Sequence, residues 1–438
     1  MSTRISRLSL IALCLITGSA PVASAASNTL TLADCLALGR ERSITMANTV
    51  RERRIADENI REIRAQALPS LNADSRFSRL GETVTYPGFE GTDNRDQYTA
   101  SVTAEQLLYS GGSVRAALRA AKSFRTQADE EVARIDALNA RDISTAFFNA
   151  LFREATARVA QESVDQLAQF EAEAKLKYDK GAISEFEWLS AQVSLANEKP
   201  RLVEAENQRD IARSVLRNLL YLDDDAWTLT HDWETSPVQM ELATLQSAGM
   251  TNRWEIKQAK ENLHILEADI NVTEGEYLPE VTAFATYAGA DPSEYNPIDD
   301  GWDWQWVAGV KASWKLIDGG ARSSVRIEKL LLKEIATDSI IDLERQVSLE
   351  IETAYRNLMQ AIRILDGARD TIRLAEKALS ISRLRFERGL ATNLEFTDRN
   401  LELNRARIQH LAGLLAYHTA IADLHYATGT DLASAPQE

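Results

Sequence analysis

The chain carries nearly the same segment twice. Residues 102–112 read VTAEQLLYSGG and residues 310–320 read VKASWKLIDGG, and the motif at Gly181 returns at Gly389 with the same offset of 208 residues. A third pair, LPSL at 68–71 and LPEV at 278–281, extends the match at an offset of 210. Solenoid repeats have periods of about 20 to 50 residues, so each copy must be a structural unit with its own strands and helices. We expect a first repeat over 26–230, a second over 231–430 and a short tail over 431–438.

The N-terminus has the pattern of a secretory signal peptide, which we place at residues 1–25. Arg4 and Arg7 precede an apolar stretch over 8–16, and Ala23-Ser24-Ala25 provides a small-residue cleavage site. Cys14 follows Ile-Ala-Leu, which lacks the small residue usual beside a lipidated cysteine, so we expect no lipid anchor. After cleavage Cys35 is the one remaining cysteine, which excludes an intrachain disulfide.

Charge and hydropathy exclude two classes of protein. The formal net charge of −16 becomes about −18 without Arg4 and Arg7, so nucleic acid is not an expected partner. The most apolar later segment, 411–427, is interrupted by His418, Asp423 and His425, so we expect no membrane helix. A mature chain that spans a bilayer would therefore use strands, which must close into a barrel because hydrocarbon cannot hydrate open edges.

Alternating segments predict two strands in each repeat. Residues 302–314 place four tryptophans on one face, and residues 97–109 repeat the alternation more weakly. The partner strands are expected at about 71–80 and 281–288, and the clearest strand at 302–316. The aromatic residues on its shared face are Trp302, Trp304, Trp306 and Trp314.

Two features near these strands have alternative interpretations. The tryptophan stripe fits an aromatic girdle at a membrane interface better than the core of a soluble sandwich. The acidic loop with Asp291, Glu294, Asp299 and Asp300 is read as a solvated loop rather than a calcium site, because its spacing matches no known set of ligands.

Long segments without helix breakers predict the helices. Each repeat opens with a helix, at 32–67 and 242–277, which Pro69 and Pro279 follow. Very long helices are expected over 113–179 and 321–387, each about 100 Å long. Returning helices are expected over 184–222 and 392–427, with a kink at Pro200 in the first.

Gly181 and Gly389 predict the hairpin tips, because a left-handed glycine commonly follows a helix end. The basic residues Lys180 and Arg388 precede them. Three residues after each glycine, Ser184 with Glu187 and Thr392 with Glu395 spell a capping box that starts the returning helix. Each repeat should therefore end in a long antiparallel helical hairpin.

Such a chain cannot satisfy its own edges, because four strands are too few to close a transmembrane barrel. Three copies would supply 12 strands and 12 long helical rods, although composition does not itself select three. The strand-strand-helix-helix plan, the Gly-Gly turns and the Gly181 and Gly389 tips resemble the TolC family of outer-membrane efflux and secretion channels. The resemblance covers nearly the whole mature chain.

This resemblance implies a mainly α fold with membrane β: a homotrimer with a 12-stranded β-barrel in outer-membrane lipid, continuous with an α-helical barrel in the periplasm. It implies passive export, with an inner-membrane transporter and a periplasmic adaptor as partners. The tips at Lys180, Gly181, Arg388 and Gly389 would dock the adaptor. Glu395 and Asp398 match the acidic rings that narrow the periplasmic end of the pore in this family. For Glu395, the alternative role is to cap its own helix.

The gate departs from the pattern of TolC itself. Phe386 stands in place of a tyrosine and Ala391 in place of an arginine, while Glu187 stands where an aspartate occurs. The polar contacts that join neighbouring hairpins of TolC at these positions therefore cannot all form in this chain. We hypothesise that Arg385 or Arg388 substitutes by pairing with Glu185 or Glu187 of the adjacent hairpin.

Enzyme chemistry has no support in the sequence. The five histidines, at 231, 264, 410, 418 and 425, form no HExxH motif, and phosphate-loop and nucleophile-elbow motifs are absent. No cofactor, metal site or catalytic residue is expected. Small-molecule efflux is slightly favoured, type I protein secretion is the alternative, and a periplasmic coiled-coil scaffold without a pore is the alternative of a different class.

Overall fold

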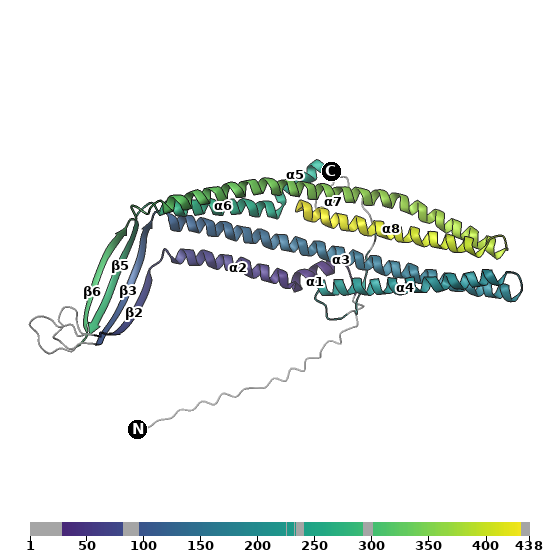
Figure 1. Ribbon diagram of the computed structural model, residues 1–438, viewed down its shortest axis with the longest axis horizontal. Coiled ribbons are helices and arrows are strands. Elements are labelled where there is room, and N and C mark those ends of the chain that lie inside the picture. The colour runs from purple at the N-terminus through teal and green to yellow at the C-terminus, as the bar shows by residue number, and fades with distance from the viewer. Residues whose placement is uncertain are drawn as a thin grey trace, which may run out of the picture.

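The computed structural model describes residues 29–81, 96–224, 226–231, 233, 241–291 and 301–430. The molecule is elongated, with a sheet at one end and helices that run from it to two hairpin tips at the other (Figure 1). The expected signal peptide, the loop residues Glu294, Asp299 and Asp300, and the tail over 431–438 lie outside the described residues.

The sheet has four antiparallel strands in the order β2–β3–β5–β6. All four expected strands are present, with ends that differ from the expected ones by one to three residues. Pairing of β3 with β5 joins the two repeats in one sheet. A parallel pair of two-residue strands, β1 and β4, was not predicted because two residues show no alternation. The strands are β1 Thr29–Leu30, β2 Ser70–Arg79, β3 Asp96–Ser110, β4 Thr228–Leu229, β5 Glu280–Asp291 and β6 Asp303–Ser313.

The long helices agree with the prediction. Helices α3 (Ser113–Asp179) and α7 (Ala321–Glu387) each have 67 residues. The returning helices are α4 (Glu185–Leu219) and α8 (Asn393–Thr428). Helix α4 continues through Pro200, so this proline does not end the helix, and the kink stays a prediction.

The prediction of one continuous helix at the start of each repeat is wrong. The first is split into α1 (Leu32–Arg42) and α2 (Ile44–Ala65), and the second into α5 (Leu242–Asn252) and α6 (Trp254–Gly275). The extended residues at the breaks, Ser43 and Arg253, are 210 positions apart. Both breaks therefore belong to the duplication, and each repeat bends at the same place.

Polar side chains stabilise each break. Ser43 Oγ accepts a hydrogen bond of 3.2 Å from the Met46 amide and so starts α2. Arg253 is buried and donates to Glu255, Glu350 and the Tyr426 carbonyl at 2.7, 2.8 and 2.9 Å. A buried guanidinium with this many acceptors fixes the α5–α6 bend against the end of α8.

Short helices α1 and α5 dock on the long ones through equivalent glycines. A Cβ on Gly39 would lie 2.1 Å from Ile143 Cδ1 in α3, and one on Gly249 would lie 2.3 Å from Ile351 Cδ1 in α7. Both isoleucines are fully buried. The duplication thus extends to the packing of the core, which lies midway along the molecule.

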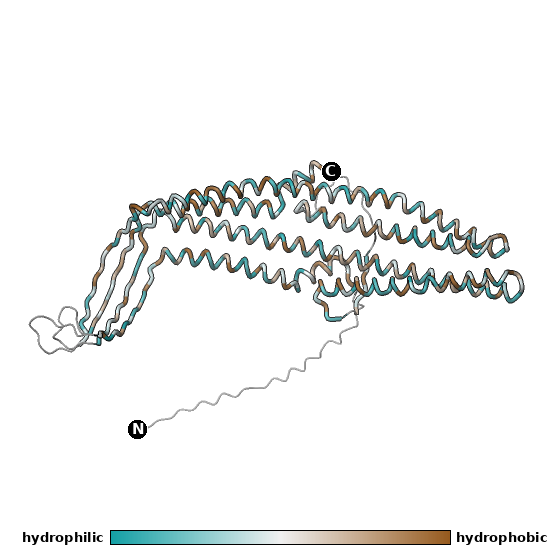
Figure 2. The backbone as a smooth tube through the Cα atoms, in the orientation of Figure 1, coloured by the Kyte–Doolittle hydropathy of each residue, from teal (hydrophilic) through white to brown (hydrophobic). Residues whose placement is uncertain are grey.

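Among the residues that the structure describes, every helix falls short of the length and apolarity that a membrane span requires. Figure 2 shows polar and apolar residues interspersed along all the long helices.

His418 of α8 lies within this central core. Its ring stacks on Phe148, with centroids 4.1 Å apart, and meets His231 edge-on at 5.3 Å. Burial, with a smaller contribution from the charge of His231, lowers the pKa of His418 from 6.5 to about 4. The neutral imidazole is therefore the form that the fold favours.

We expect stability to fall as the pH drops from about 6.5 toward 4, because the unfolded chain takes up a proton on this histidine before the folded chain does. His418→Phe should flatten this part of the stability profile by on the order of 1–2 kcal/mol, a figure reduced for the partial exposure of the ring. Thermal melts followed by circular dichroism at several pH values measure it. His264→Phe, at an exposed histidine, is the control, and an equal change in both variants would contradict the assignment.

Candidate functional site

The four-stranded sheet has one apolar face. Its register aligns Leu71, Ala104, Ala285 and Ala308 in one row across all four strands. The next row on this face contains Ala73, Val102, Tyr287 and Trp306.

The opposite face of the sheet is mostly polar. One row contains Asn72, Thr103, Thr286 and Val307, and the Thr103 and Thr286 hydroxyls lie 3.1 Å apart. The sheet can therefore separate an apolar phase from water.

Aromatic side chains lie at both ends of the apolar face. Trp304 stacks on Trp302 and on Tyr287, with ring centroids 5.4 and 5.1 Å apart. Trp314, just past the other end of β6, donates a 3.0 Å hydrogen bond to the Tyr277 carbonyl. Ten residues of strand between Trp304 and Trp314 span about 33 Å, which at a tilt of about 40° covers the roughly 25 Å of a bilayer's apolar band.

A soluble sandwich would require a second sheet on the apolar face. Apart from the two-residue β1–β4 pair, the described residues form only this one sheet. Trp306 is 77% exposed. The sandwich interpretation of the tryptophan stripe is therefore not supported, and the membrane-interface role remains a proposal.

Both edges of the chain are open. Within the described ranges β2 pairs only with β3, and β6 pairs only with β5. Exposed apolar residues continue along the helices at the two edges. They are Ile44 and Ile55 on α2, Val193, Val203 and Ile211 on α4, and Ile327, Leu331, Ile335 and Ile341 on α7.

At the far end of the molecule, the two hairpin tips have the same geometry. Gly181 and Gly389 have φ of 68° and 74°, as the sequence predicts. Their amides donate to Tyr178 and Phe386, and the amides that follow donate to Lys177 and Arg385. Both helix ends are thus closed by Schellman motifs.

The caps of the returning helices are only half as predicted. Ser184 and Thr392 each accept a hydrogen bond from the amide three residues later. Glu395 does not complete a capping box, because its carboxylate accepts from Arg385 at 3.0 Å within the same hairpin. The prediction that the Glu395 side chain caps its own helix is therefore wrong, although its backbone amide is capped by Thr392.

The two hairpins meet in a buried apolar group, here called the tip cluster. Phe170 of α3 stacks on Phe396 of α8, with centroids 4.2 Å apart and planes at 9°. It also lies 4.5 Å from Phe386 of α7. The buried members of the tip cluster are Leu167, Phe170, Ala174, Ala191, Phe386 and Phe396.

Polar contacts also join the hairpins at this point. Lys177 Nζ donates to the Phe386 carbonyl at 2.9 Å and lies 4.1 Å from the centre of the Phe386 ring. Asn393 donates to the Glu187 carbonyl at 3.2 Å. Both apolar and polar contacts therefore hold the two hairpins together near their tips.

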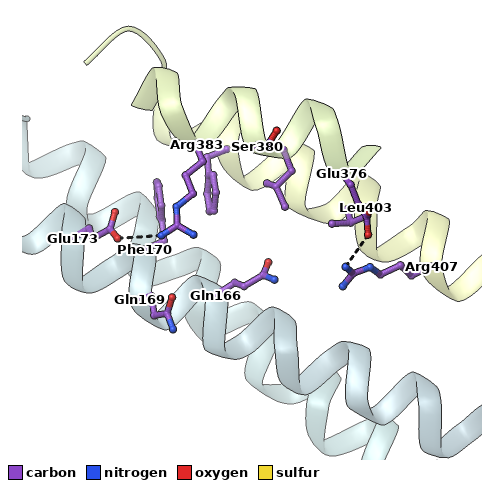
Figure 3. Close-up of a pocket in the computed structure, with 11 residues that line it drawn as sticks. Gln166, Gln169, Phe170, Glu173, Glu376, Ser380, Arg383, Leu403 and Arg407 are labelled. Atoms are coloured by element: carbon purple, nitrogen blue, oxygen red, sulfur yellow. Dashed lines mark hydrogen bonds and ion pairs between the residues drawn. The ribbon is translucent and has the colours of Figure 1, made fainter. Parts of the chain in front are cut away.

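A cavity of about 310 Å³ lies beside the tip cluster, between α3, α7 and α8. Figure 3 shows ion pairs bridging it near each end: Glu173 with Arg383 at 3.7 Å, and Glu376 with Arg407 at 3.1 Å. Arg407 also pairs with Glu162 of α3 at 3.0 Å. In the part of the chain that the structure describes, no group of three or more metal-ligating side chains is assembled.

The model of the outer membrane efflux protein family matches residues 36–220 and 247–430. The chain belongs to this family. Its two matched segments correspond to the two repeats. No curated protein is significantly similar to the chain in sequence.

Solved structures of outer-membrane channels share the fold. CusC is 14% identical with a TM-score of 0.78 over 91% of this chain and 92% of its own. The Campylobacter jejuni channel CmeC is 14% identical with a TM-score of 0.79 over 91% and 85%. VceC of Vibrio cholerae is 16% identical with a TM-score of 0.76 over 91% and 96%. The predicted architecture of the TolC family, with its helical barrel and β-barrel, is confirmed.

Within this efflux family fold, the residues predicted for the gate occupy different environments. Phe386 is 4% exposed in the tip cluster, whereas Glu185 and Arg388 are exposed. Arg385 pairs with Glu395 of its own hairpin rather than with the adjacent one. A contact of Arg388 with Glu185 or Glu187 stays a prediction.

Sequence reasoning missed Phe170, Lys177 and Asn393. One signal was available: Tyr178 and Trp188, which stack at 5.2 Å in the first hairpin, stand 208 positions before Phe386 and Phe396. This repeated aromatic pair predicts packing inside each hairpin. It does not predict that Phe170 joins the two hairpins, because Phe170 has no aromatic counterpart in the second repeat.

Proposed function

We propose that three copies of the chain form the outer-membrane exit duct of a tripartite export system. The duct is passive, and an inner-membrane transporter, joined through a periplasmic adaptor, supplies the energy. Small-molecule efflux is the favoured activity. The observation that carries this proposal is the two-faced sheet with two open edges.

Closure of the sheet requires other copies. Three sheets joined from β6 to the next β2 supply 12 strands, with the apolar face toward lipid and the Thr103 face toward a water-filled lumen. The exposed apolar residues of α7 would then lie against those of α2 and α4 in the neighbouring copy. The same contact would therefore close the helical barrel, so both parts of the chain support association with further copies.

The exposed tips provide the surface for the adaptor. Lys180, Gly181, Arg388 and Gly389 are all exposed. Phe186, Leu390 and Leu394 beside them are 78, 66 and 65% exposed. Large apolar side chains left in water at both tips support docking of a partner there.

Two experiments test the proposal. Purified mature protein should migrate as a trimer and conduct ions across a planar lipid bilayer, and a freely soluble monomer without conductance would contradict it. A deletion strain scored for dye and detergent sensitivity and for secreted proteins separates the two export classes. Sensitivity with normal secretion is expected, and the reverse result would favour protein secretion.

Charge at the tips should set ion selectivity. Asp398 is exposed, whereas Glu395 is compensated by Arg385, so Asp398 is the better source of a negative ring at the constriction. We expect Asp398→Asn to reduce the cation-to-anion permeability ratio at least about twofold and Arg385→Ser to raise it. Reversal potentials in a salt gradient measure both. Asp370→Asn, at an ion pair higher on α7, is the control and should leave the ratio unchanged.

A further inference from the structure

We infer that the seam where β6 of one copy pairs with β2 of the next carries an oxyanion-binding site on its lumen side. Lys311 of β6 and Arg76 of the next β2 form this site. Its ligands are exported molecules that bear a phosphate or carboxylate group. The inference rests on the proposed function, because the two cations lie on opposite edge strands of one chain and meet only between copies.

The register of the seam follows from the duplication. In the first repeat Asn72 of β2 pairs with Thr103 of β3. Their counterparts in the second repeat, Thr282 of β5 and Lys311 of β6, also pair. Strand β6 is therefore equivalent to β3, and β2 is equivalent to β5. A seam between β6 and the next β2 should repeat the register that β3 and β5 have within the chain.

This register places two cations directly opposite each other. Between β3 and β5, Thr103 pairs with Thr286, and their hydroxyls lie 3.1 Å apart on the polar face. At the seam, the offsets of 208 and 210 residues replace these threonines by Lys311 and by Arg76 of the next copy. Like charges directly opposite in a sheet repel each other, so an anion between them would stabilise the pair.

Carboxylates flank this pair on one side only. By the same register, Glu280 and Asp74 of the next copy both lie beside Ser313, one row closer to the helices. Two residues along a strand span about 7 Å, so neither carboxylate lies directly opposite a cation. All four charged side chains are exposed, and among the described residues none of them forms an ion pair within one chain.

The side of the pair away from the helices carries no charged group. The register places Gly309 opposite Ser78 of the next copy in this row. An oxyanion that approaches from this side would accept two hydrogen bonds from the Arg76 guanidinium and a third from the Lys311 ammonium. The Ser78 hydroxyl can donate another. The site therefore favours oxyanions, whereas the tips carry the acidic Asp398.

Disulfide cross-linking tests the geometry. Lys311→Cys combined with Arg76→Cys should give covalently joined copies on oxidation, because Cβ atoms of paired residues lie about 5 Å apart, close to the reach of a disulfide. Denaturing gels without reductant show the product. Each single variant should give none, since Cys35 is buried. A conducting trimer without cross-links in the double variant would overturn the register and the site.

Inhibition of single-channel current by inorganic phosphate tests binding. At constant ionic strength, phosphate should reduce the current of the wild-type trimer. Lys311→Gln and Arg76→Gln should each raise the half-inhibiting concentration at least about threefold, because each removes a cation at every seam. Glu280→Gln removes a neighbouring carboxylate and should lower it. Arg79→Gln, which removes a cation from the opposite, apolar face of β2, is the matched control.

No inhibition of the wild-type channel would overturn the site, as would equal inhibition of wild type, Lys311→Gln and Arg76→Gln. A loss of inhibition in Arg79→Gln as large as that in Arg76→Gln would also contradict it, because a general effect of charge would then explain the result. A wild-type protein that forms no channel would instead count against the proposed function.

Discussion

Lysine in place of Val310 is expected to prevent stable insertion of the protein into the outer membrane. Val310 lies on the apolar face of β6, opposite Ala283 of β5, and is 65% exposed in the chain. A lysine on the lipid side of a barrel costs about 2–4 kcal/mol near the middle of the bilayer, and the proposed trimer would carry the change three times. Membrane fractionation and gels that preserve the trimer should show its loss.

Val307→Lys is the matched control, because Val307 lies on the same strand but on the opposite face. It pairs with Thr286, whose hydroxyl contacts Thr103, and it is 54% exposed. A lysine there would point to the proposed lumen, so the trimer should insert as in wild type. If both lysines reduced insertion equally, the assignment of the two faces would be wrong.

The fold could be predicted from the sequence because its strongest signals are local and occur twice. Two segments of 67 residues, with at most Gly367 as a helix breaker, can form little other than very long helices. Alternation of apolar and polar residues with period two locates β6. The offset of 208 residues then predicts the equivalent strand in the first repeat. Pairing of β3 with β5 was not predicted, because two equivalent hairpins could be joined in one sheet either there or through β6 and β2.

The breaks at Ser43 and Arg253 could not be predicted in this way. The helix-forming pattern continues across them, and the acceptors that stabilise the bend at Arg253 include Glu350 and Tyr426, about 100 and 170 residues away. A distant contact of this kind leaves no mark on the local periodicity. The bend at Arg253 therefore depends on the tertiary structure, which places Glu350 and Tyr426 beside it.

The candidate site shows the same division between local and distant signals. Gly181 and Gly389 were predicted correctly because a helix end is set by nearby residues. Arg385 or Arg388 was predicted to pair with Glu185 or Glu187 of the adjacent hairpin, and this stays a prediction, although within one chain Arg385 pairs with Glu395. Phe170 was missed because its role depends on how two hairpins pack, which no single hairpin encodes.

Alanine at Gly111 is expected to destabilise the protein by about 3 kcal/mol or more, the range of substitutions that combine backbone strain with a steric clash. Gly111 has φ of +64°, which disfavours a side chain. A Cβ there would also lie 2.1 Å from the carbonyl oxygen of Gly275 at the end of α6. Because that atom belongs to the backbone, the clash can be relieved only by moving α6 away from the start of α3.

Gly112→Ala separates the clash from the strain. Gly112 has φ of +87°, but a Cβ there would meet nothing within 4 Å, so about 1–2 kcal/mol is expected. Thermal unfolding and the yield of folded protein measure the stability of both variants. Equal losses would show that backbone strain alone, and not the clash, accounts for the loss of stability.

Gly319, the counterpart of Gly111, has open space around it because it lies at the edge of the chain. By the duplication, the group that should face Gly319 in a trimer is the end of α2 from the next copy, so its substitution should affect assembly more than the folding of one chain.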